Sequence, residues 1–162
     1  MVVMADQGGR RDGIEREITI GAPLDRVWEL VSQPGWFIGG PDGGTAGQKR
    51  SREGGLDIVE DPRYGRFGGR LEASDPPRYL AYRWAALKPG EALDRSKGTL
   101  VEFWVEESGE GTTVRVLETG FEELDLSDEE RRKAVEGNAE GWRIMMDVLR
   151  KRALSGVGED AE

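Results

Sequence analysis

The strongest constraint on the fold is a long segment, residues 47–121, in which apolar and polar residues alternate, followed by one long amphipathic helical segment. Alternation with a period of two is typical of strands that bury one face. Turn-forming Gly, Pro and Asp residues divide the segment into strands. The six predicted strands are 47–53, 55–60, 65–74, 78–86, 98–107 and 111–121. Their short connections predict antiparallel pairing.

Further elements are predicted on both sides of this segment. Residues 14–20 alternate as a strand, and residues 23–32 carry apolar residues at helical spacing, with Pro23 in the first turn. The last helix is predicted over 127–154. It starts at a capping box, in which Ser127 is followed three residues later by Glu130. Gly137 and Gly141 lie inside this helix, where each costs about 1 kcal/mol relative to Ala, so another role is expected for them.

This order predicts an α+β domain over residues 14–154, with solvated, disordered tails at 1–13 and 155–162. A seven-stranded antiparallel sheet must cover its apolar face, and only the last helix is long enough to do so. A strongly curved sheet around a helix leaves a space lined by aromatic and aliphatic residues. Spaces of this kind hold small molecules.

The composition excludes several classes of site. The chain has no Cys and no His, which excludes disulfides, thiolate nucleophiles, Cys or His zinc sites and Ser-His catalytic pairs. Asp57, Glu60 and Asp61 could bind a hard cation, but the spacing of a calcium loop is missing. No phosphate-binding loop motif follows the Gly-rich stretch at 39–44. We therefore expect no metal and no cofactor.

The charge balance limits the partners. The sequence has 32 acidic and 23 basic residues, and a net charge of −9 disfavours binding to nucleic acid and to anionic membranes. No apolar run approaches the roughly 20 residues that a membrane-spanning helix needs, so no membrane insertion is expected. The N-terminus lacks the pattern of a signal peptide, and a cytoplasmic protein is expected.

Several short motifs, taken in order, resemble one known family. They are 18–23 (ITIGAP), 27–28 (VW), 68–70 (GGR), 75–78 (DPPR), 82–84 (YRW), 111–114 (GTTV), 118–121 (ETGF) and 141–142 (GW). In order and spacing they resemble the START-like, or SRPBCC, superfamily, and within it the branch named after the activator of a heat-shock-protein ATPase. The resemblance implies a helix-grip fold over nearly the whole folded chain. Its relatives include lipid and hormone carriers, polyketide cyclases and aromatases, and co-chaperone domains.

Candidate ligand-binding residues lie on the last helix and after the first one. Trp142, Met145 and Met146 share the inward face of the last helix, either as a cavity wall or as plain core. Trp36 and Phe37, with the neighbouring Ile38, form a short helix or a turn. The resemblance places this cluster at the cavity mouth, where it is either a lid or a hydrophobic plug.

Further candidates lie on the strands. Tyr82 and Trp84 share one parity on their strand, while Arg83 has the other, so Tyr82 is a cavity candidate and Arg83 is predicted to be solvated, as is Arg70. Phe103 alternates inward on the next strand.

Glu118 is the ionisable residue of most interest, because it shares the inward parity of Val114 and Val116. An inward carboxylate is costly unless it is hydrogen-bonded or paired. One interpretation is a polar anchor or an acid/base group in the cavity with a raised pKa, which makes Glu118 the one weak candidate for a catalytic residue. The alternatives are a partly exposed strand-end Glu or a structural pair with an Arg.

Three functions remain open. The first is binding of a small hydrophobic or amphipathic molecule, such as a lipid. The second is an enzyme resembling polyketide cyclases, in which Glu118 and Tyr82, with or without Arg70, would have to converge. The third, implied by the resemblance, is a stress-response domain that associates with a chaperone ATPase. We rank a chaperone partner last, because no separate chaperone-binding module accompanies the domain.

Overall fold

The structure, a computed structural model, describes residues 13–160, and side chains as far as residue 155. One seven-stranded antiparallel sheet has the order β1-β7-β6-β5-β4-β3-β2. Its strands are β1 (Ile14–Ile20), β2 (Lys49–Glu53), β3 (Leu56–Asp61), β4 (Gly65–Asp75), β5 (Tyr79–Ala86), β6 (Thr99–Ser108) and β7 (Gly111–Thr119). The strands from β2 to β7 pair in sequence order, as the short turns predict, and β1 pairs with β7 at the other edge of the sheet.

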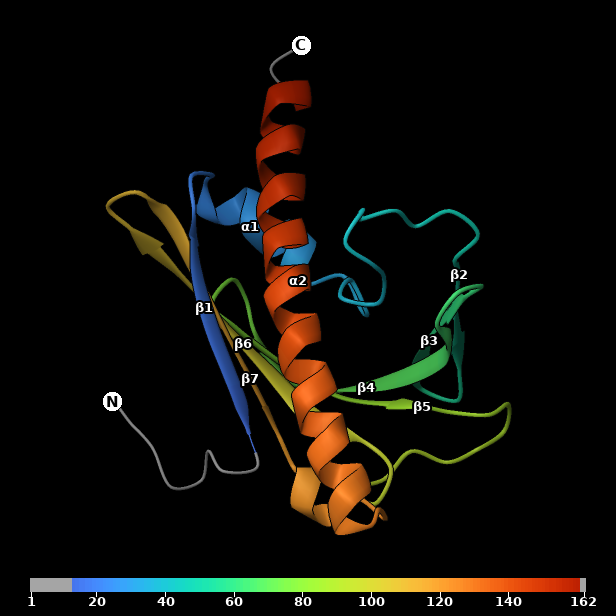
Figure 1. Ribbon diagram of the computed structural model, residues 1–162. Helices are drawn as coiled ribbons and strands as arrows, with labels where there is room; N and C mark the ends of the chain where they lie inside the picture. Colours follow the sequence, from blue (N-terminus) through green and yellow to red (C-terminus); the bar gives the residue numbers. More distant parts are fainter. Residues whose placement is uncertain (1–12, 161–162) are drawn as a thin grey trace.

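Within residues 13–160, two helices and one 3₁₀ turn complete the fold. They are α1 (Leu24–Val31), η2 (Phe121–Glu123) and α2 (Asp128–Asp160). Figure 1 shows α2 in front of the curved sheet, with β1, β6 and β7 close behind it and β2, β3 and β4 bending away on the other side. This is the predicted arrangement of a bent antiparallel sheet around a long C-terminal helix.

Alternation along β6 and β7 creates the main core. Phe103 and Val105 point inward from β6 and pair with Val116 and Val114 of β7. Phe103, Val114 and Val116 are completely buried. Trp142, Met146 and Leu149 of α2 belong to the same buried cluster. The helix therefore covers the sheet through the apolar stripe that its sequence periodicity predicts.

The path of the sheet changes in β4. A register shift between Leu71 and Ala73 interrupts its pairing with β5. Nearer the start of β4, Gly69 pairs with Trp84, and a Cβ on Gly69 would lie 2.6 Å from the Trp84 indole. Only a glycine lets the indole approach the β4 backbone this closely. The aromatic wall at this end of the sheet thus depends on Gly69.

Most predicted elements are confirmed to within two residues at each end. The capping box is present, because the Glu130 amide donates to Ser127 Oγ at 3.1 Å and the Ser127 amide donates to Glu130 Oε1 at 2.9 Å. The cluster at 36–38 forms a turn and not a second helix. α2 continues to Asp160 and does not end at 154, because the glycines that follow cost helix stability without preventing helical backbone. Of the predicted tails, residues 1–12 and 161–162 lie outside the described residues.

The prediction that Arg83 is solvated is wrong. Its side chain is buried, with Nε 3.5 Å from a carboxylate oxygen of Glu72 and Nη1 donating to the Gly98 carbonyl at 3.2 Å. The segment between β5 and β6 folds over the outer face of β5 and forms a second small apolar cluster with Leu87 and Leu93. Arg70, on the neighbouring strand, is exposed as predicted.

Candidate ligand-binding cavity

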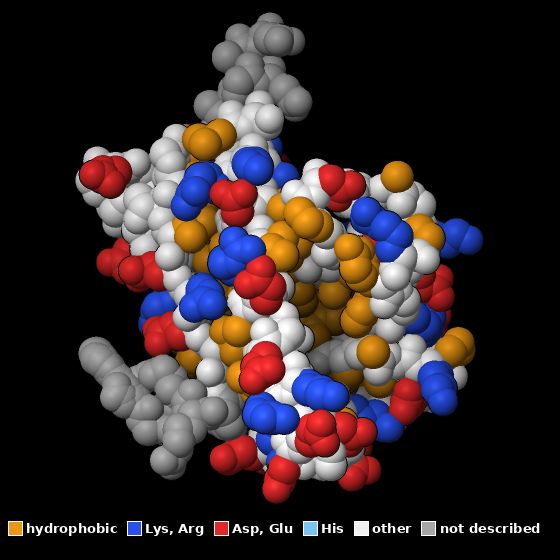
Figure 2. Space-filling model, in the orientation of Figure 1, with side chains coloured by type: hydrophobic (Ala, Val, Ile, Leu, Met, Phe, Trp, Pro, Cys, Tyr) orange, Lys and Arg blue, Asp and Glu red, His pale blue; other side chains and the backbone are white. Residues whose placement is uncertain are grey.

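A cavity of about 550 Å³ lies between α2, the inner face of the sheet and the loop that follows α1. Figure 2 shows it as a hollow beside α2, with hydrophobic side chains on its walls. This volume lies within the usual range of roughly 300–1,000 Å³ for small-molecule sites. The sheet therefore does not close completely onto its helix.

The helix wall of the cavity contains two glycines. Gly137 and Gly141 are one turn apart on α2, and both line the cavity together with Trp142 and Met145. A Cβ added to either glycine would meet no atom within 4 Å. These positions therefore face open space, and any larger side chain there would extend into the cavity or its mouth.

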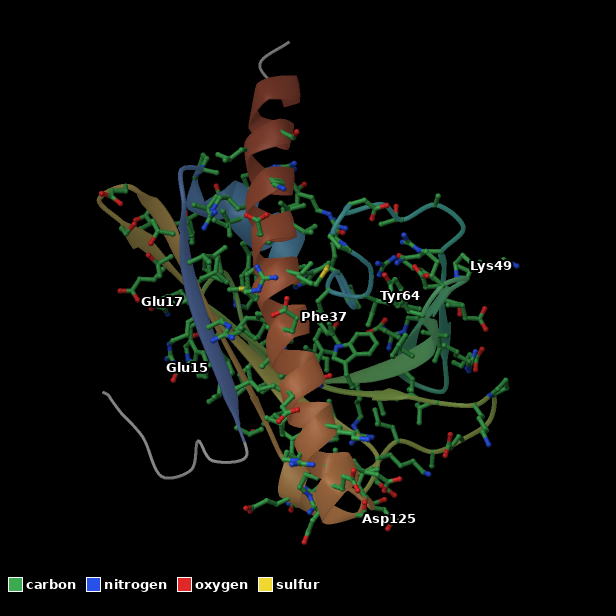
Figure 3. The ribbon with its side chains drawn as sticks, viewed as in Figure 1. Glu15, Glu17, Phe37, Lys49, Tyr64 and Asp125 are labelled. Atoms are coloured by element: carbon green, nitrogen blue, oxygen red, sulfur yellow. The ribbon has the colours of Figure 1, made fainter. Side chains whose placement is uncertain are left out.

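The loop wall is aromatic. The Phe37 ring lies 5.0 Å from the Trp142 ring and 5.4 Å from the Trp84 ring, measured between centroids. Phe37 thus bridges the helix and the sheet at the edge of the cavity. Figure 3 places Phe37 beside α2 and Tyr64 on the side of β3 and β4, and both residues line the cavity.

Glu118 is the buried carboxylate of this cavity. It belongs to β7, is 4% exposed and lines the cavity wall. Its Oε1 accepts a hydrogen bond from the Trp142 indole N–H at 2.8 Å, and its Oε2 accepts one from the Thr99 hydroxyl at 2.5 Å. The side-chain amide of Asn138 donates to both oxygens, at 3.3 and 3.2 Å. Residues of α2, β6 and β7 thus meet at one carboxylate.

The environment of Glu118 favours its neutral form. Burial raises the pKa of the Glu118 carboxyl above its ordinary value, while hydrogen bonds from Thr99, Trp142 and Asn138 oppose the shift. Within the described residues no Lys or Arg nitrogen lies within 4.0 Å of this carboxylate. The alternative of a structural pair with an Arg is therefore wrong, and the hydrogen bonds compensate for burial in its place.

The structure divides the predicted site residues into two groups. Phe37, Trp84, Glu118, Trp142 and Met145 line the cavity. The others are buried in the core and do not line it; they are Trp36, Tyr82, Phe103 and Met146.

The position of Tyr82 shows that the inward parity of a strand residue does not by itself identify the residues that line the cavity. Its ring points to the inner face, as does that of Trp84, and the two centroids are 5.8 Å apart. Its hydroxyl, however, donates to an Asp57 carboxylate oxygen at 3.4 Å, and burial together with this carboxylate raises the pKa of Tyr82 to about 12. Neither Tyr82 nor Arg70 lines the cavity, so they do not converge with Glu118.

Sequence reasoning missed several lining residues, among them Tyr64, Phe67, Thr99 and Asn138. Asn138 precedes Trp142 by four residues, and residues at this spacing share a helix face. That spacing could have placed Asn138 beside Trp142. Thr99 lies two residues before Val101, the partner of Glu118 in the β6–β7 hairpin, so the register of this hairpin could have placed Thr99 beside Glu118.

The comparisons with known proteins agree with this fold. The family model of the Activator of Hsp90 ATPase homolog 1-like protein matches residues 21–153. A protein from Mesorhizobium loti has a similar structure at 18% identity and a TM-score of 0.63, over 88% of this chain and 96% of that one. No curated protein matches the sequence.

Two other solved structures are similar at low identity. The Aha1 dimer from Colwellia psychrerythraea matches at 15% identity and a TM-score of 0.56, over 85% of this chain and 96% of that chain. DynU16, a protein of the dynemicin biosynthetic locus, matches at 21% identity and a TM-score of 0.63, over 90% of this chain and 48% of that chain. At such low identities, the similarity to these solved structures shows a shared fold only. The family model, in contrast, matches most of the sequence and therefore shows the family. The chain belongs to the family of Activator of Hsp90 ATPase homolog 1-like proteins.

Proposed function

We propose that this protein binds a small hydrophobic or amphipathic molecule in the cavity between its sheet and α2. The observation that carries the proposal is the open, largely apolar space in front of Gly137 and Gly141. Apolar walls that enclose unfilled space forgo packing contacts, and glycines inside a helix forgo roughly 1 kcal/mol each. A ligand in the cavity would recover the packing that these positions lack.

The polar side of the proposed ligand would lie near Glu118. Apart from this carboxylate, the cavity walls around Trp84, Val101 and Trp142 are mainly apolar. Sites for small molecules commonly combine such walls with a few fixed polar groups that set the ligand's orientation. A hydroxyl or amine on the ligand is the natural partner of Glu118, and the rest of the ligand would be apolar.

Catalysis remains a second candidate function, favoured by the same residue. A buried carboxyl with a raised pKa inside a cavity is suited to general acid or base chemistry. Because Tyr82 and Arg70 lie outside the cavity, Glu118 would act with Thr99 and Asn138 in their place. Ligand binding requires no proton transfer by Glu118, and it is therefore the function that we propose first.

Native mass spectrometry of the protein purified from its own cells tests the binding proposal directly. We expect a retained molecule, or saturable binding of an environment-sensitive dye and of fatty acyl ligands at micromolar concentration. Gly141→Leu should abolish this binding, because the new side chain would enter the cavity. Glu136→Leu, at an exposed position of α2 outside the cavity, is the matched control. Equal dye binding by both variants would place the dye elsewhere and contradict the proposal.

A further inference from the structure

A second hollow, of about 280 Å³, is lined by residues from the end of α1, the connection to β2, β2 itself and α2. Its walls are mostly polar: Leu30, Gln33, Thr45, Gln48, Arg50 and Arg152. It shares no lining residue with the large cavity. Ligand binding in this hollow is therefore independent of ligand binding in the large cavity.

The hollow brings together two guanidinium groups that have no acidic partner among the side chains that the structure describes. Arg50 comes from β2 and Arg152 from α2, and within the part of the chain described with side chains neither group lies within 4.0 Å of a carboxylate. Most other arginines here are paired; Arg63, Arg66 and Arg115, for example, each contact an acid. In a chain with a net charge of −9, two neighbouring cations without an acid between them form an unusual arrangement.

Both guanidiniums are held in place by neutral acceptors. Arg152 donates to the carbonyl oxygens of Trp36 at 3.1 Å and Gly43 at 3.0 Å. Arg50 donates to the carbonyls of Pro34 and Gly35 and to Gln48 Oε1. A guanidinium has five N–H groups, so each side chain is oriented by these contacts and keeps donors for a further acceptor.

The electrostatics of the pair favour an anion. Burial lowers the pKa of Arg50 below its ordinary value. Burial, followed by the nearby charge of Arg50, does the same for Arg152. Arginine stays protonated in proteins, so this shift reports an unfavourable environment for two positive charges. An anion between the two groups would relieve both desolvation and repulsion.

We propose that the hollow between Arg50 and Arg152 is a binding site for a phosphate group, carried by inorganic phosphate, by a small phosphomonoester or by a lipid headgroup. A phosphate monoester carries a charge of about −1.5 to −2 at neutral pH, which matches two guanidiniums better than the single charge of a carboxylate does. Thr45 and Gln33, on the same walls, supply neutral hydrogen-bonding groups for the remaining oxygens.

Calorimetry and NMR test this site in the full-length protein. Inorganic phosphate, glycerol phosphate and chloride are titrated at constant ionic strength, while the arginine Nε–H signals are followed in ¹⁵N-labelled protein. We expect saturable binding of phosphate or its monoester, with the Arg50 and Arg152 signals shifting and chloride giving no saturation. Vesicles that contain phosphatidic acid form a third arm, and binding confined to them would assign the phosphate to a lipid headgroup.

Substitutions distinguish a phosphate-binding role of the two arginines from a merely structural one. Arg152→Gln should weaken phosphate binding about ten-fold or more, as expected for the loss of a charge-assisted contact. Because Arg152 also holds the loop, a second variant, Thr45→Glu, keeps both guanidiniums and places a carboxylate in the hollow, and it should abolish binding. Arg115→Gln, at an ion-paired arginine elsewhere on the sheet, should leave binding unchanged.

Three results would overturn the proposal. They are the absence of saturation by phosphate, glycerol phosphate and the vesicles alike, equal responses to phosphate and chloride, and phosphate binding that survives Thr45→Glu.

Discussion

The indole N–H of Trp142 and the carboxylate of Glu118 are 2.8 Å apart, and their hydrogen bond joins α2 to β7 at the wall of the cavity. The remaining donors to this carboxylate, Thr99 and Asn138, are neutral as well. A buried acid supported only by neutral donors keeps its affinity for a proton. Its contribution to folding therefore depends on pH.

Glu118→Gln should change how stability varies with pH. The pKa of Glu118 is raised in the folded protein above the ordinary value of 4.5. The folded state then binds more protons than the unfolded state at pH values above 4.5, so the contribution of Glu118 is fully present below that pH and is lost as the pH rises through the folded pKa. We expect the variant to gain stability relative to the parent protein as the pH rises from 4.5, as measured by urea unfolding.

The difference between the two proteins is the relevant quantity, because other carboxyls titrate in the same range. Asp61 and Asp94, for example, have lowered pKa values, and their contribution is lost toward acid pH in both proteins. Glu106→Gln, at an exposed position of β6, serves as the control. A constant difference between Glu118→Gln and the parent protein from pH 4 to 8 would show that burial does not perturb Glu118.

Local sequence patterns were sufficient to predict the helices and strands and the inward direction of the Glu118 side chain. Alternation with Val114 and Val116 placed this carboxylate inward, and Ser127 with Glu130 located the start of α2. Both inferences depend on neighbours within a few residues. Short-range patterns of this kind are the part of a fold that a single sequence displays most directly.

The extent of the cavity could not be predicted in the same way. Tyr82 and Trp84 share one parity, yet only Trp84 lines the cavity, because the Tyr82 side chain extends toward Asp57 of β3. Arg83 was misplaced for a related reason, since the segment that buries it folds back from residues 87–98. Burial of a strand residue by a distant segment depends on long-range packing and leaves no periodic signal in the sequence of the strand itself.

Phe103→Leu should destabilise the protein without removing a cavity contact. Phe103 is completely buried between Trp36 and Trp142, with ring centroids 5.6 and 5.8 Å away, and it does not line the cavity. The smaller side chain should cost about 1–2 kcal/mol in transfer and packing free energy. Dye affinity should stay within about three-fold of that of the parent protein.

Phe37→Leu tests the opposite case, an aromatic residue that does line the cavity. Phe37 is half-buried and lines the cavity, so its loss should weaken dye binding more than it lowers the melting temperature. The reverse pattern, with Phe103→Leu losing the dye and Phe37→Leu retaining it, would move the binding site away from this cavity.

Gly69→Ala should destabilise the sheet and disturb the aromatic wall together. The new methyl group would lie 2.6 Å from the Trp84 indole, a distance that requires the ring to move. Overpacking of this kind typically costs about 1–3 kcal/mol. A lower midpoint of urea unfolding and a shifted tryptophan emission spectrum are expected. Gly109→Ala, where the added methyl group meets no atom within 4 Å, should leave the tryptophan emission unchanged.

Replacing both cavity glycines of α2 by alanine should stabilise the protein while reducing the room for a ligand. Neither Cβ of the Gly137→Ala, Gly141→Ala variant would meet an atom within 4 Å, so no strain opposes the gain in helix propensity. This gain is about 0.5–1 kcal/mol at each site, and a higher melting temperature in calorimetry would report it. The same methyl groups enter the cavity, so dye affinity should fall. If stability rises while dye affinity is unchanged, these glycines do not serve to keep the cavity open; if stability falls, the backbone at these positions needs glycine for a reason other than space.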